Sequence, residues 1–180
     1  GQQYIVEIII ENGNPLIGKK FIAGLLPELE NCSVRLITRK NEKLLPPYDE
    51  VEIELEDKIT LSITKGNLTS ALKRNDQVFS TIGKQSDSTK PEVIIEAAIT
   101  PGSFLIGRNI SQTNFENEVS CRVIGIQKGI NTEVDRLNSL KLNAGNIILL
   151  KGSEKSIRSL RGIKDIFPIE WSAIYHTSKL

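Results

Sequence analysis

The sequence contains one short motif twice, Leu-Ile-Gly followed by a basic residue. "NPLIGKKF" appears near the start and "SFLIGRNI" after the midpoint, so that 89 positions separate Gly18 from Gly107. The same offset, without gaps, brings further residues into equivalent positions: Glu7 with Glu96, Cys32 with Cys121, and Leu61 with Leu150. A period this long exceeds the roughly 20 to 50 residues of solenoid repeats. The offset therefore predicts two copies of one small domain in a chain of 180 residues, and each copy is large enough for a modest core.

Each copy shows the same order of expected elements. Both open on a run of β-branched residues, which favours a buried strand. The expected strands are 4–11, 34–39, 51–55 and 58–64 in the first copy, and 93–100, 122–127, 140–143 and 146–151 in the second. The expected short helices are 19–29 and 68–73, and then 108–117 and 154–160. The predicted fold class is α+β, with two homologous small domains that are each a mostly antiparallel sheet with short helices.

A polar stretch divides the two copies. "GKQSDSTKP", residues 83–91, lacks apolar anchors and is expected to be a linker. The expected domains are therefore 1–82 and 92–168. Residues 169–180 remain as a tail. For the aromatic stretch "FPIEWSAIYH", residues 167–176, three roles stay open: packing on the domain, covering a sheet edge, or leading into a transmembrane helix.

Composition narrows the classes of protein that fit. The chain has 23 Lys and Arg and 22 Asp and Glu, which gives a formal net charge of +1. A charge this small does not favour binding to nucleic acid. No apolar run reaches the roughly 18 residues of a membrane span, and we expect a soluble class. The chain has no Met and begins with Gly1, which we interpret as a fragment of a longer chain. The two cysteines lie in apolar strand patterns, which predicts buried thiols in a reducing setting.

Three cations are weak candidates for ligand binding. Lys19, Lys20 and Arg108 stand beside a glycine where a helix is expected to begin, and exposed N–H groups there can bind a phosphate. The alternative is that they point to solvent, because cations oppose the dipole at a helix N-terminus. No G-x-G-x-x-G phosphate loop accompanies them.

Clustered carboxylates are weak candidates for a metal site. The run "YDEVEIELED" places Glu50, Glu52 and Glu54 at every second position, which on a strand is one face. Divalent cations prefer such oxygen ligands. The alternative is a solvent-facing or edge strand, since the equivalents in the second copy are not acidic: Ser139, Lys141 and Asn143. We expect no metal and no cofactor.

Catalysis has little support in the sequence. A single His, no nucleophile motif and no placeable catalytic group predict a protein that is not an enzyme. Glu7 and Glu96 lie at matched positions in apolar strands, where a half-exposed position or a structural ion pair is expected.

Each copy resembles a TrkA C-terminal domain, the C-terminal lobe of the regulator-of-potassium-conductance module. The first copy carries the pattern in "PLIGKK", "LITRK" and "LEDKITLSI", and the second in "FLIGRN", "IGIQK" and "NAGNIILLKG". The usual Gly-Asp turn is altered to Glu56-Asp57 and Gly145-Asn146. Tandem pairs of this domain are similar to those in the cytosolic loop of sodium-coupled divalent-anion and sulfate symporters.

The resemblance implies a non-catalytic module of a membrane ion transporter, on the cytoplasmic side of the plasma membrane, that senses a ligand and dimerises. Its expected partners are the transmembrane part of the same polypeptide and a second copy, as a homodimer or an intrachain pseudo-dimer. A small-molecule or ion ligand is possible, and nucleic acid is not expected. Two alternatives stay open: a purely structural dimerisation module without ligand, and a regulatory fragment of a potassium uptake or channel system.

Overall fold

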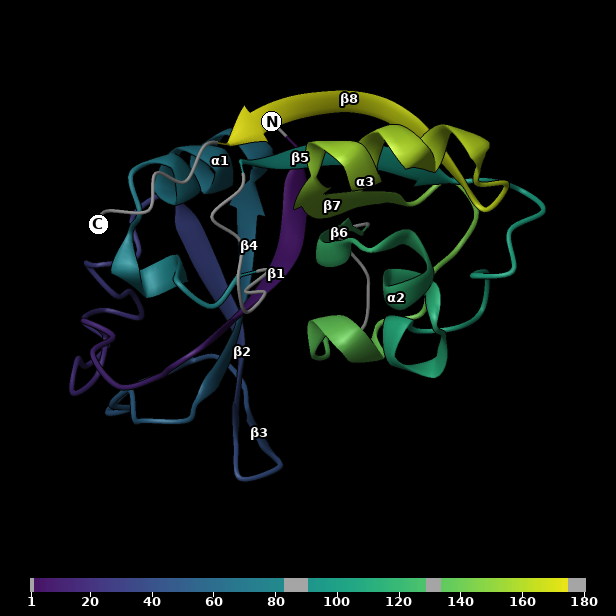
Figure 1. Cartoon of the computed structure of the whole chain (residues 1–180). Coiled ribbons are helices and arrows are strands. Elements are labelled where there is room, and N and C mark those ends of the chain that lie inside the picture. Colours follow the sequence, from purple (N-terminus) through teal and green to yellow (C-terminus); the bar gives the residue numbers. More distant parts are fainter. Residues whose placement is uncertain (1, 83–90, 129–133, 175–180) are drawn as a thin grey trace. The chain divides into compact units, whose positions relative to one another are not determined.

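Two compact units make up the chain in the computed structural model (Figure 1). The structure describes residues 2–82, 91–128 and 134–174, so most of the expected linker, 83–90, lies outside the described residues. Unit 1 consists of residues 1–82 together with 131–136, and unit 2 consists of 83–130 and 137–180. The boundaries expected from the sequence stay a prediction.

Unit 1 is built on an antiparallel sheet in the order β3-β2-β4-β1. Its strands are β1 (Gln3–Ile9), β2 (Cys32–Arg39), β3 (Glu42–Leu44) and β4 (Lys58–Thr64). Helix α1 (Lys65–Lys73) follows β4 and begins where the Thr64 side chain accepts a hydrogen bond from the N–H of Asn67, and the 3₁₀ helix η1 (Gln77–Phe79) comes next. The core contains the fully buried Val6, Ile8 and Leu61.

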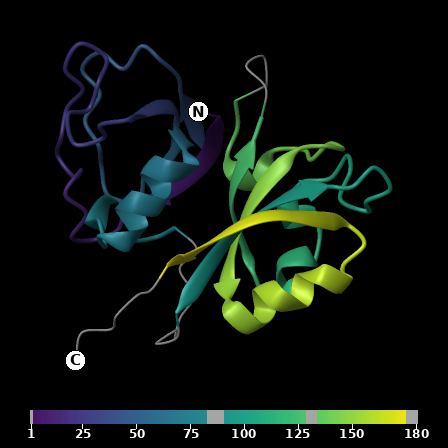
Figure 2. The same cartoon turned by 90° about the horizontal axis from the view of Figure 1, so that it is seen from above.

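Unit 2 has an antiparallel sheet in the order β6-β7-β5-β8 (Figure 2). Its strands are β5 (Glu92–Ile99), β6 (Arg122–Gln127), β7 (Ile147–Ser153) and β8 (Ile166–Ile174). Its helices are η2 (Ile110–Gln112), α2 (Phe115–Val119), η3 (Leu137–Ser139), α3 (Glu154–Arg158) and η4 (Ser159–Gly162). The sheets and short helices confirm the α+β class expected from the sequence.

Backbone hydrogen bonds recur in the two units at the 89-residue offset. The N–H of Gly18 donates to the carbonyl of Ile53, and the N–H of Gly107 donates to the carbonyl of Leu142, both over 2.8 Å. Both glycines have positive φ, of 81° and 79°, which a glycine adopts without steric cost. The repeated Leu-Ile-Gly motif therefore forms a backbone turn in each unit, and its glycine is hydrogen-bonded to an equivalent residue, Ile53 or Leu142.

The helices expected at 19–29 and 108–117, and the strands expected at 51–55 and 140–143, differ in the structure. Residues 19–29 form turns and two bridges instead of a helix, because Ala23 and Gly24 have left-handed φ values of 51° and 79°. In unit 2, the expected helix 108–117 is replaced by η2 and the short α2. The expected strands 51–55 and 140–143 are reduced to single bridges, at Glu52 and Leu142.

Strand β8 extends beyond the expected end of the second domain. It pairs antiparallel with β5 from Ile166 to Ile174, although the sequence assigns residues 169–180 to a tail. Of the three roles left open for that tail, the described part takes one, because it covers the edge of the unit 2 sheet. Strand β3 lies outside the expected elements and is a short hairpin partner of β2.

Both cysteines are free thiols. Cys121 is fully buried and Cys32 is half-buried. Burial raises the pKa of both thiols to about 11, and the charge of Asp76 adds to the shift at Cys32. The expected packing role therefore fits, with one thiol less covered than the other.

We expect iodoacetamide at pH 8 to alkylate both thiols far more slowly in the native protein than in urea, because the thiolate is the nucleophile. The pKa of each thiol lies above the ordinary 9.0 in the folded state. The protonated thiols therefore contribute stability below pH 9, and that stability is lost as the pH rises towards 11. Urea unfolding at pH 8 and pH 10.5 measures the loss, which the Cys121→Ala variant should reduce. Equal alkylation rates in the native and unfolded protein would contradict this account.

Candidate functional site

The candidate cations from the sequence are exposed beside the two glycine turns, where Lys20 forms an isolated bridge with Glu52. Lys19 and Lys20 are exposed in unit 1, and Arg108 is exposed in unit 2. Arg108 is engaged locally, because its Nη1 donates to the Phe104 carbonyl over 2.6 Å and its guanidinium lies 4.0 Å from the centre of the Phe104 ring. None of the three lines either of the two cavities described below.

The candidate carboxylates do not share a strand face. Glu50 has a φ of 66°, which breaks the extended backbone that the alternation required. Glu54 forms an ion pair with Arg39, 2.5 Å between its Oε2 and Nη1, and the carbonyl of Glu52 also accepts from Arg39. Among the residues that the structure describes, no group of three or more His, Cys, Asp or Glu is arranged to hold a metal.

Asp57 is the centre of the charged cluster in unit 1. Its side chain is 1 % exposed and accepts from Nε of Arg39 over 2.9 Å, from Nη2 of Arg39 over 2.8 Å and from the N–H of Glu54 over 2.9 Å. The hydrogen bond to Asp57 is also the main reason that the pKa of Arg39 is raised. In unit 2 the equivalent Asn146 accepts from the N–H of Asn143 over 2.8 Å. The turn therefore needs an acceptor, and the charge is particular to unit 1.

A second charged pair in unit 1 contains Glu7, for which the sequence predicts a half-exposed position or a structural ion pair. The carboxylate of Glu7, with a side chain 10 % exposed, receives two hydrogen bonds of 3.0 Å from the guanidinium of Arg136. The neighbouring Asp135 pairs with Lys43 over 3.3 Å. The hydrogen bond that Arg136 donates to Glu7 is the first cause of the raised pKa of Arg136. Of the two roles expected for Glu7, the structural ion pair fits.

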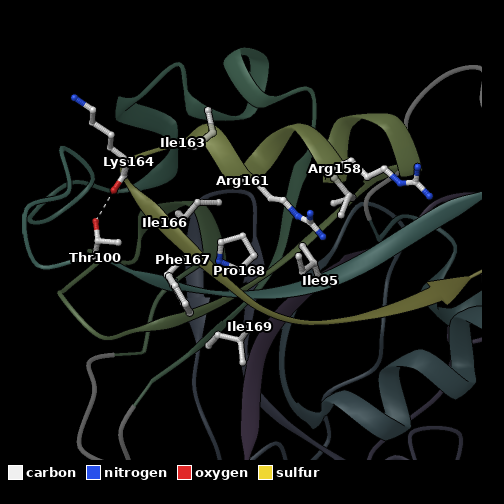
Figure 3. A pocket seen from close by; sticks show the side chains of 11 residues that line it. Ile95, Thr100, Arg158, Arg161, Ile163, Lys164, Ile166, Phe167, Pro168 and Ile169 are labelled. Atoms are coloured by element: carbon white, nitrogen blue, oxygen red, sulfur yellow. Dashed lines mark hydrogen bonds between the residues drawn. The ribbon is translucent and has the colours of Figure 1, made fainter.

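The strongest candidate site is a cavity of about 860 Å³ in unit 2, between α3 and η4 and the strands β5 and β8 (Figure 3). Its floor is aliphatic and well covered, because Ile95, Ile157 and Ile166 are 6 %, 3 % and 3 % exposed. Ile163 and Pro168 add to the same apolar lining. The volume lies within the roughly 300 to 1,000 Å³ of small-molecule pockets.

Three cations border this cavity at intervals of three residues: Arg158, Arg161 and Lys164. Figure 3 shows the guanidinium of Arg161 reaching over the floor towards Ile95, whereas the ammonium of Lys164 points away. Arg158 also contacts the carboxylate of Glu154 on the exposed side of the helix. No acidic residue is among the described residues that line the cavity. Arg161 is therefore the cation best placed to meet an anion above the apolar floor.

A smaller cavity of about 540 Å³ lies in unit 1, next to Asp57. Cations and carboxylates both line it, including Lys40, Lys58 and Glu56. Its central guanidinium, that of Arg39, is already bonded to Asp57, Glu54 and the Glu52 carbonyl. The lining of this cavity is therefore of mixed charge, and it does not favour a ligand of either sign.

Comparison with known protein families is decisive for unit 2, because residues 94–164 match the family model described as the TrkA-C domain. A TrkA-C domain is found at residues 94–164. The matched range includes α3, η4 and the guanidinium of Arg161, but it ends before β8 begins. The cavity is thus formed by the TrkA-C domain together with the strand that follows it.

One distant relative matches nearly the whole chain. It is an "Uncharacterized transporter" of Synechocystis sp., 23 % identical over 193 residues, a match that covers 94 % of this chain and 29 % of the relative. The chain therefore spans less than a third of the length of the relative. No solved structure matches the chain. Within the described ranges, no helix has the length and apolar character to cross a membrane.

Sequence reasoning missed the cavity of the TrkA-C domain. Its local signal is the interval of three residues between the cations of "RSLRGIK", which makes Arg158 and Arg161 neighbours on a helix, whereas Lys164 lies beyond the end of η4. The floor has no such signal, because it forms only when β8 is laid against β5, far away in the sequence.

Proposed function

We propose that the chain is a non-catalytic regulatory module of a membrane transporter, made of two TrkA-C-like domains. The TrkA-C domain at 94–164 and the transporter relative support the regulatory role. The second domain is inferred from the recurrence of backbone hydrogen bonds at the offset of 89 residues. For example, Glu56 donates to the carbonyl of Ile10 over 2.7 Å, as Gly145 donates to that of Ile99 over 2.9 Å.

The module regulates transport by binding a small anionic ligand in the cavity of unit 2. The observation that carries this proposal is the placing of Arg161 over an aliphatic floor on a domain of a regulatory family. In unit 1 the position equivalent to Arg161 is Leu72, which is 5 % exposed and part of the core. The shared fold therefore does not require an arginine there, which favours ligand sensing over a purely structural module.

The wider setting follows from the resemblance to modules of sodium-coupled anion symporters. We place the chain on the cytoplasmic side of the plasma membrane, joined to a transmembrane part, and paired either with a second chain or between its own two domains. A potassium uptake or channel system is the second setting. Sedimentation decides the pairing, because a monomer at high concentration would exclude the interchain dimer.

Removing the charge of Arg161 should change the rate of transport. In membrane vesicles that contain the complete transporter, we expect Arg161→Gln to alter sodium-dependent sulfate uptake by about fivefold or more, the lower end of usual allosteric coupling. Lys155→Gln is the matched control, because Lys155 is an exposed cation of the preceding helix α3 that does not line the cavity.

Uptake is normalised to the amount of protein in the membrane. If Arg161→Gln and an in-frame deletion of the whole module both transport like the wild type, the regulatory proposal is wrong. If the deletion alone changes transport, the module is structural. Uptake that follows potassium instead of sulfate would favour the second setting.

A further inference from the structure

We infer that the ligand of the unit 2 cavity is an anionic aliphatic amphiphile, with a carboxylate or phosphate head on a hydrocarbon chain. This inference rests on the proposed ligand-sensing function and names the chemistry of the ligand. It depends on the contrast between the single well-placed guanidinium at the rim and the composition of the floor.

The head of the ligand is set by Arg161. A guanidinium offers a planar fork of donors that fits carboxylate and phosphate oxygens in pairs. Arg161 extends over the floor, while Arg158 is shared with Glu154 and the ammonium of Lys164 points outwards. Arg161 can therefore pair with one anionic group above the floor. The further charges of a polyphosphate would have no partner there.

The tail of the ligand is set by the floor. Ile95, Ile157, Ile163 and Ile166 are branched aliphatic side chains, and Pro168 completes the surface. The hydroxyl of Thr100, the one uncharged polar side chain among the described lining residues, already donates to the carbonyl of Lys164 over 2.8 Å. A nucleotide base needs donors and acceptors along its edge. The side chains of this floor offer no free donor or acceptor for a base, and their aliphatic surface fits a hydrocarbon chain.

The aromatic side chain at the cavity does not change this assignment. Phe167 is 65 % exposed, and Figure 3 shows it on the opposite side of β8 from Ile166 and Pro168. It is therefore not placed over the floor as a stacking platform for a planar base. Alternation along β8 instead directs the aliphatic side chains of Ile166 and Pro168 towards the helices.

The same chemistry has two sources, a free amphiphile in solution and an anionic lipid in a bilayer. Titration calorimetry on the 180-residue chain, with hexyl, octyl and decyl phosphate kept below micelle formation, tests the first. We expect affinity to rise about three- to tenfold for each two methylenes, since each buried methylene contributes to transfer. Inorganic phosphate and AMP should bind at least about tenfold more weakly than decyl phosphate.

Variants establish that binding occurs at the cavity. Arg161→Gln should weaken decyl phosphate by about tenfold, as expected for loss of a charge-assisted bond, and Arg161→Lys should recover part of it. Lys155→Gln should bind like the wild type. Arg161 and Lys155 are both exposed, so circular dichroism should show the same fold in all variants.

Flotation with phosphatidylcholine vesicles, with and without phosphatidic acid, tests the second source. Binding of monomeric decyl phosphate identifies a free amphiphile, and Arg161-dependent flotation without monomer binding identifies a bilayer lipid. Either outcome supports the inference. Affinity that does not depend on chain length, equal binding of inorganic phosphate or AMP, or no binding of any probe would overturn it. The transport response to Arg161→Gln would still stand in each case, because it does not depend on the identity of the ligand.

Discussion

Replacing Asp57 with alanine should lower the free energy of unfolding of unit 1 by about 3 to 5 kcal/mol, the usual cost of breaking a buried ion pair from one side. The carboxylate is 1 % exposed and holds both the fork of Arg39 and the N–H of Glu54. Its removal leaves the Glu54 N–H without its acceptor and a guanidinium, only 25 % exposed, without its main partner. Urea unfolding followed by far-ultraviolet circular dichroism measures the change.

Asp57→Asn is the matched control, and it should cost less than Asp57→Ala. Asn146 shows that an amide oxygen satisfies the equivalent turn in unit 2, where it accepts from Asn143. The amide therefore keeps the bond to Glu54 and loses only the charge opposite Arg39. A cost below about 1 kcal/mol for Asp57→Ala would show that the cluster is a surface pair with little net worth.

Cutting back one core leucine in each unit should destabilise that unit by about 2 to 5 kcal/mol. Leu61 and Leu150 occupy equivalent positions and are both fully buried, so the two substitutions to alanine form a matched pair. The single tryptophan, Trp171, belongs to β8 of unit 2 and reports on that unit by fluorescence. We expect Leu150→Ala to shift the fluorescence transition in urea to lower concentration.

Leu61→Ala should instead shift a transition that is seen by circular dichroism and leave the fluorescence midpoint in place. This result would establish that the two units unfold separately. A single transition that both substitutions move equally would contradict the prediction, and would show that the units form one cooperative structure.

The sequence predicted the parts of the fold that depend on local pattern. Runs of β-branched residues located β1, β4, β5 and β7, because such side chains favour a buried pleated surface. The repeated phrase located two equivalent turns, since only the glycine at each accepts the positive φ without strain. The helix expected at 19–29 failed because Ala23 adopts a left-handed conformation, which a propensity for helix does not reveal.

The candidate site was beyond the reach of sequence pattern. Lys19, Lys20 and Arg108 attracted attention because they stand beside a glycine, yet they are exposed and line neither cavity. Arg161 lacked any motif, and its position over an apolar floor arises from the pairing of β8 with β5. Contacts between distant segments decide such a surface, so the local spacing of the cations does not reveal the apolar floor beneath them.

The ion pair between Glu7 and Arg136 joins two distant parts of the sequence within unit 1. Glu7 depends on a guanidinium that lies 129 residues later, in the second half of the chain. A genetic crossover between the two halves of the chain would separate this carboxylate, whose side chain is 10 % exposed, from the guanidinium of Arg136 that pairs with it. The two halves of the chain are therefore not freely interchangeable at this pair, and a change at Glu7 is expected to require a compensating change at Arg136.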